Sequence, residues 1–162
     1  MRTFMRALVL TVAGFVVLEA GGALAAQADA LRNLREVKVS VADFGPYGEA
    51  CGLDKAAMER AFFVPLAERG LTKVVSGTAY RILIRATNVT YVENSCVSYV
   101  DVQLLLNTRY FDPLIGAERP GRVQLWYGGG LFLSDRSEHA ATLNSAFRGL
   151  GRNLGRDWDL AN

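Results

Sequence analysis

The stretch CVSYVDVQLLL (Cys96 to Leu106) decides the fold, because its apolar and polar side chains alternate with a period of two. Val100, Val102 and Leu104 fall on one side of an extended chain, and Asp101 falls on the other. Such alternation is typical of a β-strand with one buried and one exposed face. The apolar face of this strand is therefore predicted to line the core.

A second β-rich run, YRILIRATNVTYV (Tyr80 to Val92), precedes this strand and is joined to it by a three-residue connection. A connection of that length predicts an antiparallel hairpin. We expect Val92 to lie opposite Cys96, a register that also places Arg85 opposite Gln103. A slip of one residue would mix the apolar and polar faces, so the alternation favours this register.

The remaining elements are predicted from the same two periodicities. EVKVSVADF (36–44) alternates like a strand, and a helix is expected from an N-cap at Asp54 to about Arg69. RVQLWY (122–127) is a further strand ended by three glycines, with LFL (131–133) as a short continuation. A period of 3.6 predicts a final helix from about Ser137. The order β-α-β-β-β-α predicts an α+β fold, an antiparallel sheet of about four strands with two helices packed on one face.

The predicted final helix carries two glycines, Gly151 and Gly155, beside its apolar stripe. Each glycine in a helix interior costs about 1 kcal/mol relative to alanine. Close approach of this helix to the sheet would explain that cost, because glycine has no side chain to obstruct the contact.

The first 28 residues have the layout of a secretory signal peptide. Two arginines precede the charge-free run ALVLTVAGFVVL (7–18), and a small-residue stretch follows, with cleavage expected after Ala25 or Ala28. A run of twelve residues is too short to cross a bilayer as a helix. We therefore expect residues 29–162 to form a single periplasmic or secreted domain without a transmembrane segment.

The charge of the predicted mature domain argues against a nucleic-acid partner. The whole chain has a formal net charge of +2, and loss of Arg2, Arg6 and Glu19 with the leader brings it near +1. The basic residues are dispersed among acidic ones, whereas nucleic-acid binding needs a basic stripe or patch.

Residues for metal, phosphate or catalytic chemistry do not form a recognisable motif. His139 is the single histidine, is expected at the surface, and has no cysteine or histidine at metal-ligand spacing. The run Gly128 to Gly130 lacks the pattern of a phosphate-binding loop and is interpreted as a bend or bulge. We therefore expect no enzyme activity, no metal and no cofactor.

Two cysteines, Cys51 in GEACGLD and Cys96, allow two interpretations. Cys51 lies near a predicted helix start, where a thiolate is favoured, so it could serve as the nucleophile of a thiol-dependent enzyme. An even number of cysteines in an exported chain instead favours a disulfide. Cys96 also falls on the strand face that should receive the helices, close to Cys51. We therefore predict a disulfide between Cys51 and Cys96.

The polar face of the predicted sheet carries the candidate binding residues, which are Tyr91, Tyr99, Trp126, Arg85 and Asp101. Aromatic side chains mixed with arginine are typical of recognition surfaces. Ordinary cross-strand pairing on a solvated face is the alternative explanation.

Two functions follow from this arrangement. The first is a non-enzymatic exported module that binds a protein or envelope component through the open face of its sheet. The alternative is a small-ligand carrier with a pocket between helices and sheet, under Phe62, Phe147 and Leu104.

Four segments carry a resemblance to small exported bacterial proteins of unknown function: VKVSVADF, CGL before a helix, SCVSYVDVQL and the tail WDLAN. The order of elements is also similar to that of the N-terminal domain of TolB. The resemblance covers most of the predicted mature chain and implies a small α+β module of the bacterial envelope. Envelope lipoproteins carry a lipid-acceptor cysteine at the cleavage site, and this chain has none there.

Overall fold

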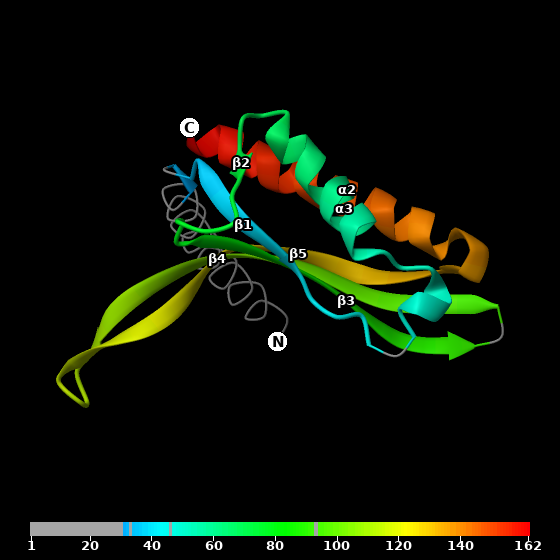
Figure 1. The fold of residues 1–162 in the computed structure, drawn as a ribbon, viewed down its shortest axis with the longest axis horizontal. Helices are drawn as coiled ribbons and strands as arrows, with labels where there is room; N and C mark the ends of the chain where they lie inside the picture. Colours follow the sequence, from blue (N-terminus) through cyan, green and yellow to red (C-terminus); the bar gives the residue numbers. More distant parts are fainter. Residues whose placement is uncertain (1–30, 33, 46, 93) are drawn as a thin grey trace, which may run out of the picture.

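The structure, a computed structural model, describes residues 31–162 except 33, 46 and 93, and omits the side chains of 88–92. The predicted signal peptide lies outside the described residues. Two layers make up the fold, a five-stranded sheet in the order β2-β1-β3-β4-β5 and a layer of helices on one face of it (Figure 1). The elements are β1 (Glu36–Val41), the 3₁₀ turn η1 (Glu49–Cys51), α2 (Lys55–Ala67), β2 (Thr72–Lys73), β3 (Tyr80–Val92), β4 (Ser95–Asp112), β5 (Ala117–Asp135) and α3 (Arg136–Ala161).

The predicted α+β fold is confirmed, with one short strand more than expected and a mixed sheet. β3, β4 and β5 are antiparallel, whereas β1 runs parallel to β2 and β3. The chain leaves β1 and crosses the sheet through α2 before it returns, and such a crossover brings the next strand back in the same direction. Asp54 caps α2 as predicted, since its Oδ1 accepts a 2.6 Å hydrogen bond from the amide of Ala57.

The β3–β4 hairpin has a different register from the predicted one but the same faces. Arg85 lies directly opposite Asp101, two residues away from the expected pairing. One residue of the difference arises at the turn, where Val92 pairs with Ser95, and the other at an irregularity just after Asn88. A shift of two leaves every side chain before the irregularity on its predicted face.

β5 continues through the three glycines and the LFL segment, so the strand does extend past the glycines, but the break expected at Gly128 is wrong. It pairs with β4 along the full length of both strands. Beyond Leu106, the last β4 residue that pairs with β3, β4 and β5 continue as a two-stranded arm (residues 107–122), yellow-green in Figure 1. Near the tip of this arm, Phe111 and Leu114 are exposed.

The core lies between the sheet and the two helices, as the apolar stripes predicted. Its fully buried side chains come from both layers, namely Val37, Met58, Phe62, Leu66, Ile82, Ile84, Val100, Val102, Leu104, Leu143, Phe147 and Leu154.

The predicted disulfide joins Cys51 at the end of η1 to Cys96 at the start of β4, with 6.0 Å between the Cα atoms. Both cysteines are fully buried. The bond therefore attaches the segment before α2 to the helix-covered face of the sheet. Closing a loop of 45 residues stabilises the fold by about 4 kcal/mol in the chain-entropy model.

Gly151 explains how closely the two helices approach each other. A Cβ atom at this position would overlap the carbonyl oxygen of Phe62 on α2. A Cβ at Gly155 would lie 2.8 Å from the Arg69 side chain, which follows α2. The predicted close approach therefore exists, but it is to the neighbouring helix and not to the sheet.

We expect Gly151→Ala and Gly149→Ala to have opposite effects on the free energy of unfolding. Gly149 belongs to the same helix, and a Cβ there would have open space around it. Gly149→Ala should stabilise the protein by up to about 1 kcal/mol through helix propensity. Gly151→Ala should destabilise it by about 1–3 kcal/mol because α2 must move away. Urea denaturation measures both, and stabilisation by both substitutions would contradict the helix contact.

Candidate functional site

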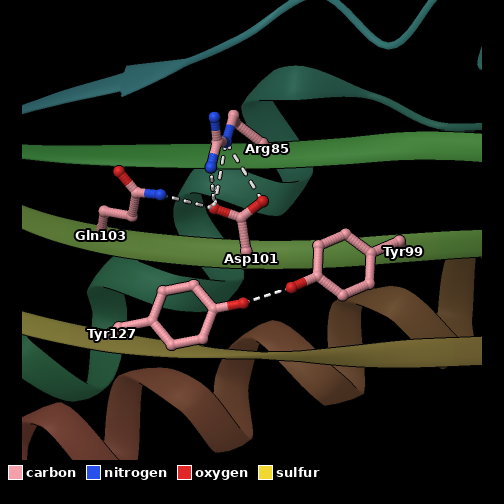
Figure 2. Close-up of polar contacts among 5 residues, drawn as sticks. All are labelled: Arg85, Tyr99, Asp101, Gln103 and Tyr127. Atoms are coloured by element: carbon pink, nitrogen blue, oxygen red, sulfur yellow. Dashed lines mark hydrogen bonds and ion pairs between the residues drawn. The ribbon is translucent and has the colours of Figure 1, made fainter.

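The face of the sheet turned away from the helices carries two adjacent hydrogen-bonded groups of polar side chains, which together we call the open-face network. Its members are Arg85 from β3, Tyr99, Asp101 and Gln103 from β4, and Tyr127 from β5 (Figure 2). The helices lie behind the sheet in this view. Three neighbouring strands therefore contribute to one surface.

Asp101 and Arg85 form the centre of the open-face network. Arg85 Nε donates to both carboxylate oxygens of Asp101, at 3.0 and 3.1 Å, and Arg85 Nη2 donates to Oδ1 at 2.8 Å. Gln103 Nε2 lies 3.3 Å from the same Oδ1. The Asp101 side chain is 4% exposed and the Arg85 side chain 42%, so the arginine covers the carboxylate while one side of its guanidinium meets solvent.

This ion pair has two effects: it compensates the charge of the buried Asp101 carboxylate, and it holds the Arg85 guanidinium in place. Its hydrogen bonds with Asp101 raise the pKa of the Arg85 guanidinium above its usual value. A buried carboxylate without such partners would be strongly destabilising. Because the two residues are directly opposite in the ladder, the guanidinium is held in one orientation before any partner arrives.

Tyr99 and Tyr127 form the second part of the open-face network, since their hydroxyl groups are hydrogen-bonded to each other. The two rings come from β4 and β5 and converge beside Asp101 (Figure 2). The residue of β5 opposite Asp101 is Gly129, and a Cβ there would lie 2.5 Å from the carbonyl oxygen of Val100, so the lack of a side chain lets β5 lie close to β4 beside Asp101. The hydrogen bond with Tyr99, together with desolvation, raises the pKa of the Tyr127 phenol above its usual value.

Apolar side chains border the open-face network on β5. Leu131, opposite Tyr99, is 66% exposed, and Leu133 is 68% exposed. Strands usually leave polar residues on a solvated face. Two leucines beside two tyrosines therefore form an exposed apolar patch next to the Arg85–Asp101 pair.

The structure brings together Arg85, Tyr99 and Asp101, as expected from the sequence. The placement of Trp126 on this face is wrong. Trp126 lies opposite Leu104 on the helix-covered face, is 5% exposed, and donates from Nε1 to Asp157 Oδ2 on α3 at 2.9 Å. The side chain of Tyr91 lies outside the described residues.

An irregularity in the β4–β5 ladder explains the misplacement of Trp126. The register shifts between Leu104 and Leu105, which leaves Leu125 as an extra residue on β5. The parity of β5 changes at that point, so Tyr127 takes the open-face position that simple alternation had given to Trp126. The glycine run directly after Tyr127 was the signal for an irregular strand, but it does not show at which residue the extra position lies.

His139 is fully buried near the start of α3, so its expected surface position is wrong. Its Nε2 lies 2.7 Å from Ser98 Oγ on β4, and its Nδ1 lies 2.7 Å from Ser134 Oγ at the end of β5. Both serines can donate or accept, so a neutral imidazole is satisfied in either tautomer. Burial lowers the pKa of His139 below its usual value. The residue joins α3 to two strands.

The other functional residues that the sequence offered have structural roles in this fold. Cys51 is bonded to Cys96, so it has no free thiolate to act as a nucleophile. Phe62, Phe147 and Leu104, under which a carrier pocket was expected, belong to one continuous buried cluster. Within the described part of the chain, no group of three or more potential ligand residues could hold a metal ion. Among the described helices, none is both long and apolar enough to cross a membrane.

We expect His139 to make stability depend on pH near neutrality. Its pKa is lowered in the folded state, so below about 6.5 the unfolded chain binds a proton that the folded protein does not. The free energy of unfolding should therefore fall as pH drops from about 7.5 to about 5.5, above the range where carboxyl groups titrate. Urea denaturation at several pH values measures this slope.

The control for the His139 experiment is His139→Gln, which keeps a hydrogen-bonding side chain but cannot titrate. This variant should lose the slope between pH 7.5 and 5.5, whatever its overall stability. An equal slope in both proteins would show that His139 does not carry the pH dependence.

No protein-family model matches the chain, and no curated protein matches it in sequence. Among solved structures, it is similar to a dodecamer of a PelC variant from Paraburkholderia phytofirmans (17% identity, TM-score 0.46, covering 76% of this chain and 88% of that one). It is also similar to a minor lipoprotein from Acinetobacter baumannii (10% identity, TM-score 0.37, covering 76% and 89%). A third similar structure, assigned as a lipoprotein, is from Caulobacter crescentus (17% identity, TM-score 0.28, covering 87% and 94%). None of these three structures is a TolB domain.

Proposed function

We propose that the chain is a non-enzymatic exported module that binds a protein partner through the open face of its sheet. One observation carries this proposal: a fixed arginine, two tyrosines and two exposed leucines share a sheet face that no described element covers. Tyrosine and arginine are enriched where binding energy is concentrated in protein interfaces. The apolar border supplies area that a partner would remove from water.

Arg85 is the polar anchor of this proposed interface. Two of its nitrogens are engaged with Asp101, while Nη1 makes no hydrogen bond to the described residues. A guanidinium already held in place loses less conformational freedom when it binds than a free one. The network therefore offers a partner an oriented donor beside an apolar patch.

Export is supported by the disulfide together with the predicted signal peptide. Disulfides persist in oxidising compartments and are rare in the cytosol. The same bond removes the only candidate nucleophile of the thiol-enzyme alternative. We therefore place the module in the periplasm or outside the cell, where an envelope protein is the expected kind of partner.

We expect Leu131→Ser with Leu133→Ser to weaken partner binding by roughly tenfold or more, because the apolar border would lose its two largest exposed groups. The immobilised protein and this double variant are incubated with an envelope extract, and retained proteins are quantified by mass spectrometry. At least one protein should be retained by the unmodified chain and lost by the variant.

The matched control is Leu160→Ser, which removes a leucine on α3 that is 79% exposed and lies in the other layer. This control should retain the same proteins as the unmodified chain. An equal loss in the control and the double variant, or full retention by both, would contradict binding through the open face.

A further inference from the structure

A groove of about 550 Å³ runs between the two helices, apart from the open face. Its lining comes from α2, the turn that follows it, and α3. The floor contains Ala61 and Pro65, which are buried, and the rim is mostly polar. A volume of this size exceeds what one inorganic ion fills and falls in the range of small-molecule sites.

The groove concentrates positive charge in a domain whose overall charge is small. Four arginines line it, Arg60, Arg69, Arg148 and Arg152, against one acidic residue, Glu68. Arg148 and Arg152 are one turn apart on the same face of α3, where like charges repel and destabilise a helix. A bound anion between the helices would remove this repulsion.

Three of these arginines have no partner among the residues that the structure describes. Arg69 donates to Asp159 Oδ2 at 3.0 Å and to the carbonyl oxygen of Pro65 at 2.7 Å. Arg60, Arg148 and Arg152, in contrast, make no hydrogen bond or ion pair with the described residues. Guanidinium groups from both helices are therefore available to a ligand in the groove.

Asn144 adds a neutral polar group to the same groove. Its Oδ1 is buried and has no hydrogen-bond partner in the described part of the chain. Buried polar atoms in native proteins are nearly always paired, so an orphan at a groove indicates a missing partner. The Asn144 side chain must turn toward the groove to expose this acceptor. Once exposed, an amide oxygen fits a hydroxyl donor, which inorganic anions without protons lack.

We propose that the groove between α2 and α3 binds a phosphate ester of a polyol, with the phosphate held by Arg60, Arg148 and Arg152 and a ligand hydroxyl donating to Asn144. This site is separate from the proposed protein interface and does not depend on it. The same chemistry occurs in soluble sugar or glycerol phosphates and in the head groups of glycerophospholipids, so the test has an arm for each source.

The test measures binding of two probes to the purified full chain. Glycerol 3-phosphate is titrated by isothermal calorimetry, and vesicles of phosphatidylglycerol are compared with vesicles of phosphatidylcholine by co-sedimentation. Arg148→Ala with Arg152→Ala should weaken binding about a hundredfold, or roughly tenfold for each charged hydrogen-bonding group. A melting curve of each variant checks that the fold is kept.

The matched control is Lys38→Ala with Arg122→Ala, which removes the same charge from exposed positions on the sheet and the arm. Saturable binding of glycerol 3-phosphate, lost in the groove variant and kept in the control, supports the site with a soluble ligand. Binding to phosphatidylglycerol vesicles alone, with the same dependence on the groove arginines, supports it with a lipid head group.

Two results would overturn the proposal. One is that neither glycerol 3-phosphate nor phosphatidylglycerol vesicles bind saturably. The other is an equal loss of binding in the groove variant and the control variant, which would indicate general charge attraction. The Leu131→Ser, Leu133→Ser protein should bind the probe like the unmodified chain. The two proposals can therefore fail independently.

Discussion

The alternation of side chains along β4 constrains the whole molecule, because this strand pairs with β3 on one side and with β5 on the other. One face of β4 carries Cys96 and Val100 into the core, and the other carries Tyr99 and Asp101 to the open side. A slip of one residue would bury the aspartate among the helices and expose the disulfide. The positions of helices, disulfide and candidate site thus follow from one strand.

The helix layer is held to its face of the sheet by contacts of different kinds. The Cys51–Cys96 bond fixes the start of α2, and the buried His139 joins the start of α3 to β4 and β5. The absence of a side chain at Gly151 lets the helices touch each other. Because these contacts keep both helices on one side, the opposite face of the sheet stays free of described elements.

The molecule therefore has two chemically different surfaces on two layers. The open face of the sheet combines one oriented arginine with tyrosine and leucine, a composition suited to a protein partner. The groove between the helices combines three arginines and an amide oxygen that have no partner among the described residues, a composition suited to a small oxyanion with hydroxyl groups. Each layer supports one proposal, and neither proposal needs residues of the other.

Period-two alternation was enough to predict the faces of Arg85, Tyr99 and Asp101, because any even error in register keeps a side chain on its face. The disulfide was predictable from the cysteine count and the parity of Cys96. The position of Trp126 was not predictable, because the extra residue Leu125 reverses the parity of β5. No residue type near Leu125 indicates that an extra residue lies at this point.

Other features depended on contacts that a single sequence does not contain. The burial of His139 requires two serines from different strands, which meet only after the sheet has formed. The parallel pairing of β1 depends on the path of the chain through α2. In the sequence, the groove arginines are scattered among other charged residues. Only the packing of the two helices brings Arg60 to the same groove as Arg148 and Arg152.

Hydroxyl-radical footprinting of the free protein tests the assignment of the two sheet faces most directly. We expect rapid modification of the exposed side chains Tyr99, Tyr127, Leu131 and Leu133 and strong protection of the buried Trp126, although tryptophan and tyrosine are both reactive side chains. Rapid modification of Trp126 together with protection of Tyr127 would contradict this assignment, because that result requires β5 to run past β4 without the extra residue at Leu125.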